Sequence, residues 1–214
     1  GRVMSLISHP RLPSDVVTAV PRQLTGTHAE RVMMPLLHLV YTSWLPIPMV
    51  RLSQHPAFLA ANGQVLGVRR STYDELGGFE SVRTEVVDDM AFCRRAKLRG
   101  HKVVFADGQH IARCRMYEDG ASLWRGFSKN LYEGIGAHPL ALAAVVVLLL
   151  GTWVLPWAVL PPALLIGWET VAAAAAIGAA LGLLTRGMLA ARYGHGALSV
   201  LAHPAAVLGL VGIA

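Results

Sequence analysis

The sequence predicts a mixed α/β part followed by an apolar part made of membrane-spanning helices. Of the 214 residues 54% are hydrophobic and only 15% are charged, and the mean hydropathy of +0.47 is higher than soluble globular domains usually reach. The apolar residues are unevenly distributed: beyond Pro139 the only Asp, Glu, Lys or Arg side chains are Glu169, Arg186 and Arg192. Before that point strand-like and helix-like segments alternate, as in α/β domains.

The apolar part is long enough for three spans, at about 140–160, 163–184 and 197–214. A helix of about 20 apolar residues crosses the hydrocarbon core of a bilayer. Three prolines are expected to end the first span and reverse the chain: Pro156, Pro161 and Pro162.

Basic residues predict the orientation of these spans. Several precede the first span, and Arg186 and Arg192 lie between the second and the third, so both flanks are expected in the cytoplasm. The chain is therefore expected to be a multi-pass protein of the cell (inner) membrane with its polar part cytoplasmic. Glu169 would lie about two turns inside the second span, where it either has a function or reaches the headgroups.

The polar part begins with a strand expected at Val3–Ser8. An apolar stretch at 28–52 follows, interrupted by three prolines and carrying Tyr41. This stretch predicts helical pieces that lie in the membrane interface, and a buried core helix is the equally weighted alternative.

Two strands and two helices are expected in the rest of the polar part. A strand at 64–68 precedes a short helix, for which Ser71 and Asp74 form a possible capping box and Gly77-Gly78 a stop. A second helix runs from Asp88 to Arg99 and ends at Gly100, and residues 102–106 form the next strand.

The adjacent carboxylates Asp88 and Asp89 begin this second helix. The free amides and positive end of a helix favour ionised carboxylates there, so capping alone would explain the pair. Catalysis is the alternative reading, and the neighbouring sequence supports it.

Several segments occur in a fixed order over about forty residues: Asn62-Gly63-Gln64, Val68-Arg69-Arg70, Glu75-Leu76-Gly77-Gly78-Phe79, Val87-Asp88-Asp89 and Arg94–Val103. Together they resemble the acceptor-side half of a family 2 glycosyltransferase. The resemblance implies the C-terminal part of a GT-A-like (nucleotide-diphospho-sugar transferase) domain at 1–137, followed by the membrane part at 138–214. It also implies that Asp89 is the catalytic base and that Asp88 replaces the family's usual Glu. The substrate-binding residues it implies here are Asn62, Gly63, Gln64, Arg69 and Gly78.

Polysaccharide-forming members of the family often carry Gln-x-x-Arg-Trp just before the membrane. The matching segment here is Gly126-Phe127-Ser128-Lys129-Asn130, preceded by Trp124-Arg125, so only a basic residue is kept. This region is more similar to membrane-bound enzymes that glycosylate a hopanoid, carotenoid or related lipid, and it implies that Arg125, Lys129 and Asn130 bind substrate. Leu123, Phe127 and Leu131 recur every four residues, which predicts a helix lying on the bilayer while its basic residues meet phosphates. The alternative is that the basic residues only anchor this helix.

The family's donor half has no counterpart, because no two Asp residues in this chain are separated by a single residue. A divalent metal, Mg or Mn, is therefore expected only in the full-length enzyme, and no His or Cys spacing predicts metal ligands here. The implied partners are a nucleotide-sugar donor, a lipid acceptor and the membrane. Nucleic acid is not expected, because the basic residues do not form one stripe with exposed aromatics. Two alternatives remain, a processive polysaccharide synthase and a non-enzymatic transporter or membrane scaffold.

Overall fold

The computed structural model describes Ile7 and residues 13–134 and 138–213. The chain forms two compact units, residues 1–24 with 40–116 and residues 25–39 with 117–214. This grouping differs from the expected division at residue 137, because residues 25–39 and residues 117–134 pack with the apolar helices.

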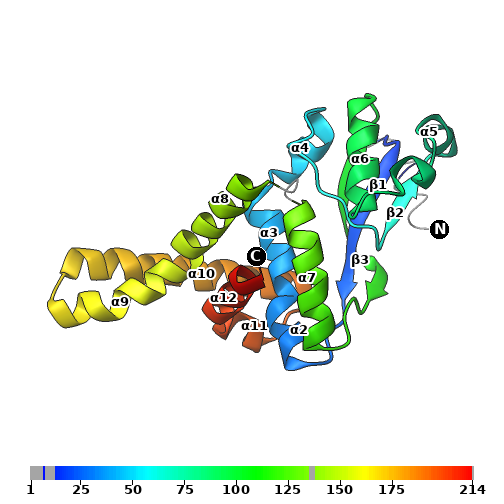
Figure 1. The fold of residues 1–214 in the computed structure, drawn as a ribbon. Helices are drawn as coiled ribbons and strands as arrows, with labels where there is room; N and C mark the ends of the chain where they lie inside the picture. The colour runs from blue at the N-terminus through cyan, green and yellow to red at the C-terminus, as the bar shows by residue number, and fades with distance from the viewer. Residues whose placement is uncertain (1–6, 8–12, 135–137, 214) are drawn as a thin grey trace. The chain divides into compact units, whose positions relative to one another are not determined.

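The first unit is built on a three-stranded sheet in the order β2-β1-β3 (Figure 1). The strands are β1 (Val16–Gln23), β2 (Leu66–Val68) and β3 (Val103–Cys114). β1 pairs antiparallel with β2 and parallel with β3, so Val16 lies opposite both Val68 and Val103. The sheet confirms a mixed α/β part and the two predicted strands, and β3 extends well beyond residue 106.

The central strand β1 was not predicted. Its first six residues are buried, as expected for a strand covered on both faces. Pro21 obscures the pattern, because proline cannot donate to a sheet ladder; it lies where the β1–β3 register shifts, between Pro21 and Arg22. The strand predicted at Val3–Ser8 lies outside the described residues except for Ile7.

Helix α6 (Asp88–Leu98) packs on this sheet and confirms the predicted helix. Phe92, Cys93 and Ala96 are fully buried in a cluster with Val16 and Val103 of the strands. The helix ends as expected at Gly100, which has a φ of +84°. The Gly100 and His101 amides donate to the carbonyls of Lys97 and Ala96, which satisfies the helix end.

Three short helical elements complete the first unit: α4 (Ile47–Leu52), α5 (Arg70–Glu75) and the 3-10 turn η1 (Phe79–Val82). The predicted capping box of α5 is wrong, because Arg69 is the N-cap and no side chain caps the helix. Asp74 instead accepts a hydrogen bond from Arg70 at 2.8 Å. The stop is confirmed: Gly77 and Gly78 have φ of +79° and +60°.

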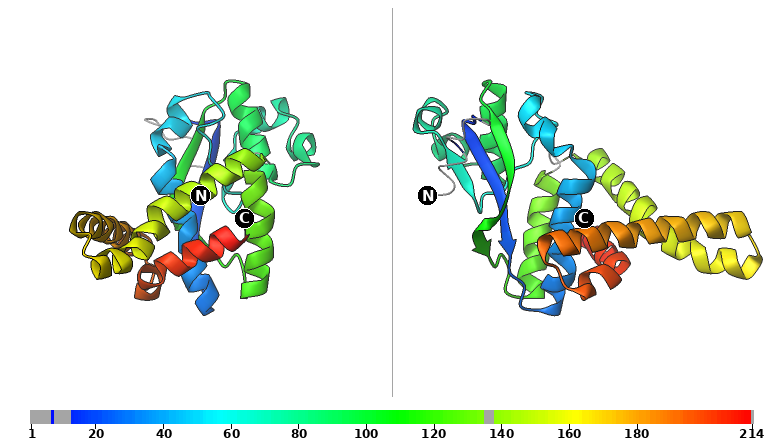
Figure 2. Two further views of the ribbon diagram at one scale, coloured as in Figure 1. Left: turned by 60° about the vertical axis from the view of Figure 1, so that its left-hand side comes forward. Right: turned by 180° about the vertical axis from the view of Figure 1, so that it is seen from behind.

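The second unit consists of helices, and two of its segments form a long hairpin (Figure 2). One segment runs from Pro139 to Ile166 through α8 (Pro139–Leu149), the π-helical stretch η2 (Leu150–Val154) and α9 (Leu155–Ile166), and the other is α10 (Glu169–Tyr193). With 28 and 25 residues they are about 42 and 38 Å long, and both are long and apolar enough to cross a membrane.

The predicted spans need two corrections. The chain does not reverse at Pro161-Pro162, because α9 continues through both prolines and turns at Gly167, which adopts the left-handed conformation with φ of +78°. The predicted third span is not one continuous helix, because residues 197–213 form α11 (Ala197–Leu201) and α12 (His203–Ile213).

Small residues allow α10 to pack closely on the other arm of the hairpin. Its buried residues follow one face: Ala172, Ala175, Ala179, Gly182, Arg186, Leu189 and Ala190. A Cβ at Gly178 would lie only 3.1 Å from Cγ of Pro156, and one at Gly182 would lie 3.7 Å from the Trp153 ring. Close backbone approach at small residues is the usual basis of helix packing in membranes.

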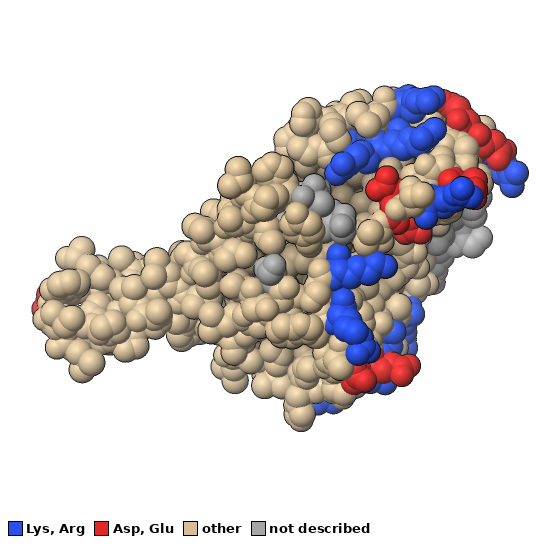
Figure 3. Space-filling view, in the orientation of Figure 1, with Lys and Arg blue, Asp and Glu red and all other residues tan. Residues whose placement is uncertain are grey.

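The outer surface of the hairpin is apolar and exposed. Leu165 is 89% exposed, and in Figure 3 the visible face of the hairpin is tan, the colour of residues other than Lys, Arg, Asp and Glu, apart from red at its tip. Glu169 is the first residue of α10, beside the turn, and not two turns inside a span. At this helix N-terminus its charge is favoured by the helix dipole.

The remaining helices are α2 (His28–Met33), α3 (Pro35–Trp44) and α7 (Gly120–Gly134). Met33, Met34, Leu36 and Leu39 are buried in the protein, which favours the core-helix alternative for the first part of the 28–52 stretch. A capping box not noticed in the sequence begins α2: the Thr27 side chain and the Glu30 side chain cap each other's backbone amides.

Candidate functional site

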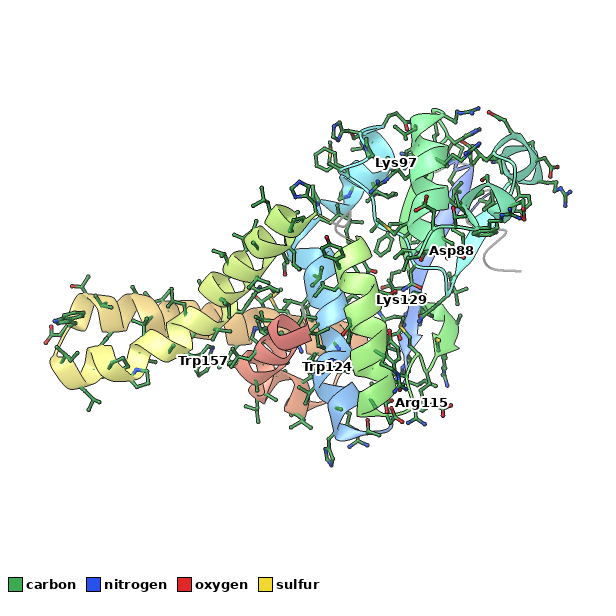
Figure 4. The ribbon with its side chains drawn as sticks, viewed as in Figure 1. Asp88, Lys97, Arg115, Trp124, Lys129 and Trp157 are labelled. Carbon is green, nitrogen blue, oxygen red and sulfur yellow. The ribbon has the colours of Figure 1, made fainter. Side chains whose placement is uncertain are left out.

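Asp88 and Asp89 form the first turn of α6, at the end opposite Lys97 (Figure 4). Asp88 is exposed and Asp89 is half-buried. Oδ2 of Asp89 accepts a hydrogen bond from the Gly63 amide at 2.5 Å, and Oδ1 accepts one from the Met90 amide at 2.8 Å. Because a carboxylate offers about four acceptor positions, both oxygens can still accept from a further donor.

The Asn62-Gly63-Gln64 loop is positioned by the central strand. The backbone amide of Asn62 donates to the Thr18 hydroxyl at 2.7 Å, and that hydroxyl donates to the Asn62 carbonyl at 3.1 Å. Gln64 accepts a hydrogen bond from the Gln23 side chain at 2.8 Å. A Cβ at Gly63 would lie 3.3 Å from Oδ2 of Asp89, so glycine suits this close approach of backbone to carboxylate.

Tyr41 and Cys93 also lie near the Asp89 carboxylate, and the sequence analysis did not assign either to the site. Burial, and secondarily the charge of Asp89, raises the pKa of both side chains to about 12. The Tyr41 ring packs on Phe105 of β3 with ring centroids 5.1 Å apart. Cys93 follows Asp89 by one helical turn, a spacing that could have identified it; no sequence signal pointed to Tyr41.

Arg69 and Gly78 serve the fold of the first unit. The Arg69 guanidinium donates to the carbonyls of Ser14 and Ile7, at 2.8 and 3.1 Å, and lies 3.5 Å from Oδ1 of Asp15. A Cβ at Gly78 would lie 2.7 Å from the Tyr73 ring. The structure thus places Gly63 against Asp89, and Asn62 and Gln64 flank Gly63 in the same loop. Arg69 and Gly78 contact other parts of the first unit instead.

Arg125, Lys129 and Asn130 lie on α7, in the second unit. Arg125 and Lys129 are exposed, and Lys129 points to a different side of the helix from Trp124 (Figure 4). The predicted bilayer contact through Leu123 and Phe127 is wrong, because both side chains are buried within the protein. The Phe127 ring packs against Tyr117, with centroids 5.8 Å apart.

Gly126 stands where the polysaccharide-forming enzymes have the Gln of Gln-x-x-Arg-Trp. A Cβ at this position would overlap the ring and hydroxyl of Tyr117. Tyr117 therefore fills the space that a glutamine side chain would need. The glycine that replaces the motif's glutamine thus makes room for the Tyr117 ring against α7.

Within the described part of the chain, no three His, Cys, Asp or Glu side chains are grouped so that they could hold a metal ion. Comparison of the sequence and the structure with protein-family models, curated proteins and solved structures found no match.

Proposed function

We propose that this chain is the acceptor-side and membrane part of an inverting glycosyltransferase, which moves a sugar from a nucleotide-sugar to a lipid at the cytoplasmic face of the membrane. One observation carries the proposal: the Gly63 amide donates to Asp89. This contact joins two of the ordered segments, 26 positions apart in sequence, that gave the resemblance to family 2 glycosyltransferases.

The arrangement at Asp89 suits a general base. Two backbone amides fix the direction of the carboxylate, and its remaining lone pairs can accept the proton of an acceptor hydroxyl. The hydroxyl oxygen would form a bond to the anomeric carbon while the bond from that carbon to the nucleotide diphosphate breaks. The proton would pass to Asp89, and the nucleotide diphosphate would leave with its electron pair.

The described residues do not form the metal site expected of such an enzyme, so no step of the proposal is assigned to a metal in this chain. Residues other than these would have to supply the donor-binding half. The proposal for this chain is therefore confined to the base, the acceptor side and the membrane attachment.

A lipid acceptor is favoured by the apolar hairpin, whose two segments could each cross a bilayer. Transfer of a single sugar is favoured over processive synthesis by Gly126, where Tyr117 occupies the space of the missing glutamine. The transporter alternative loses its main support, because Glu169 is the first residue of α10, beside the turn, and is not embedded within a span.

The test is the replacement Asp89→Asn in the full-length protein. Membranes containing each variant are incubated with a panel of radiolabelled nucleotide-sugars, and label in the extracted lipids is counted. Loss of a general base should lower transfer by about 10²–10⁴-fold. Asp74→Asn is the matched control, because Asp74 is exposed and only pairs with Arg70 on the surface.

An Asp89→Asn protein that folds, by circular dichroism, and still transfers sugar at the normal rate would exclude Asp89 as the base. Label in long polymers instead of glycolipids would favour the processive alternative.

A further inference from the structure

Two leucines are unusually exposed in the first unit. Leu52 and Leu98 are 70% and 65% exposed, more than any other large apolar side chain of that unit in the described ranges. Isolated exposed leucines need no explanation, but these two come from elements that meet. Leu52 ends α4, and Leu98 ends α6.

Lys97 holds these two helix ends together. Its Nζ donates to the carbonyl oxygens of Val50 at 2.9 Å and Phe58 at 2.5 Å, and its side chain is 1% exposed. Val50 is two residues before Leu52, and Lys97 directly precedes Leu98. The ends of α4 and α6 that carry the two leucines therefore lie next to each other. We call the exposed and half-buried residues of these two ends the α4–α6 surface: Arg51, Leu52, Arg94, Arg95, Leu98 and Arg99.

The arginines of the α4–α6 surface have no carboxylate partner among the ion pairs of the described residues. Two other acids of the first unit pair with arginines outside this surface: Asp74 with Arg70 and Glu80 with Arg83. Arg94 and Arg99 are exposed, and Arg51 and Arg95 are half-buried. Figure 3 shows Lys and Arg side chains gathered over the ends of α4 and α6.

We propose that the α4–α6 surface docks on the anionic headgroups of a lipid bilayer. Anionic headgroups attract arginines that lie near the membrane surface, and exposed leucines can insert at the headgroup boundary. The chain's own hairpin would hold this surface near a bilayer and raise its effective concentration there. Leucines offer no ring on which bases could stack, which disfavours nucleic acid. The proposal rests on the membrane part of the proposed function and not on glycosyl transfer.

The test places an environment-sensitive fluorophore on Leu98→Cys in the full-length protein, reconstituted in nanodiscs. The background carries Cys114→Ser; Cys93 remains, because it is fully buried and burial raises its pKa to about 12, which suppresses thiolate formation. Discs of phosphatidylcholine alone are compared with discs that also contain phosphatidylglycerol. The same probe on Ser71→Cys, an exposed site on α5, is the control.

The probe at position 98 should shift to the blue only in discs with phosphatidylglycerol, and high salt should reverse the shift. The double change Arg94→Glu with Arg99→Glu should abolish it, while the probe at position 71 should respond to neither lipid. Both arginines are exposed, so the charge changes leave the core intact.

Equal emission in the two discs, or a shift that survives the two charge reversals, would overturn the proposal. So would a response to added RNA in discs lacking phosphatidylglycerol, which would assign the surface to nucleic acid. Incorporation of the protein into the nanodiscs is measured separately, as the amount of protein in the purified discs. A protein that enters neither disc contradicts the hairpin and this proposal together, whereas one that enters without a shift contradicts this proposal alone.

Discussion

At the scale of single residues, Lys97 places an amine in the interior of the first unit. Its Nζ donates to the Val50 carbonyl of α4 and to the Phe58 carbonyl of the segment that leads from α4 toward the Asn62-Gly63-Gln64 loop. Burial lowers the pKa of the amine, because the charged form loses solvation. The two hydrogen bonds offset part of the lost solvation energy, and they attach α4 and the segment around Phe58 to α6.

Lys97→Met should destabilise the protein by about 1–3 kcal/mol, since methionine fills the space but leaves the Val50 and Phe58 carbonyls without this donor. Lys102→Met, at an exposed position, should change the free energy of unfolding by no more than about 0.5 kcal/mol. Denaturant unfolding in detergent, followed by circular dichroism, measures both. Equal midpoints for the two variants would show that Lys97 does not hold the segment.

Cys93 gives a prediction about pH. Burial and the Asp89 charge raise its pKa from 9.0 to about 12 in the folded protein. A raised pKa means that the folded state keeps a proton that the unfolded state releases, so this stabilisation is complete below pH 9 and is lost as the pH rises toward 12.

Cys93→Ala should therefore flatten the fall in unfolding free energy between pH 9 and about 12. Cys114→Ala is the control and should keep the slope of the unchanged protein. The contributions of Tyr41 and Lys97 are common to all three proteins and cancel in the comparison. Parallel pH profiles for the Cys93 variant and the control would contradict the assignment.

At the scale of elements, the packing of α10 on the other arm of the hairpin depends on glycine at one contact. Gly178 faces Pro156, whereas Gly187 on the same helix has nothing within 4 Å of the position a Cβ would take. The two glycines therefore form a matched pair in one helix.

Gly178→Leu should destabilise the hairpin by about 1–3 kcal/mol through overpacking, and Gly187→Leu should not. Thermal unfolding in detergent, followed by helical circular dichroism, measures the difference. A destabilisation that is equal for the two variants would indicate a general effect of leucine on α10 and not the contact with Pro156.

At the scale of the whole molecule, the apolar hairpin and the proposed cytoplasmic site predict a topology. The turn at Gly167-Trp168 should lie on the side of the membrane opposite the sheet unit, because each hairpin segment is long enough to cross. Trp168 is 60% exposed, so a cysteine there can be labelled without disturbing the fold.

Trp168→Cys should react with a membrane-impermeant maleimide in intact cells, and Ser71→Cys only after the membrane is opened. Both are made in the Cys114→Ser background. Labelling of both positions, or only of Ser71→Cys, in intact cells would contradict the proposed orientation.

The sequence by itself determined the features that depend on neighbours along the chain. Asp88 and Asp89 at the start of α6, its end at Gly100 and the stop at Gly77-Gly78 follow from charge and backbone preference within a few residues. The apolar character of the last third was equally plain from composition.

Only the tertiary structure decided what depends on residues far apart. It made β1 the central strand despite Pro21, moved the hairpin turn to Gly167, and brought Gly63 and Tyr41 to Asp89. The physical reason is that strand pairing, close helix packing and the burial of a charge are energies of non-local contacts. Local patterns indicate which residues can make such contacts, and the folded chain selects the partners.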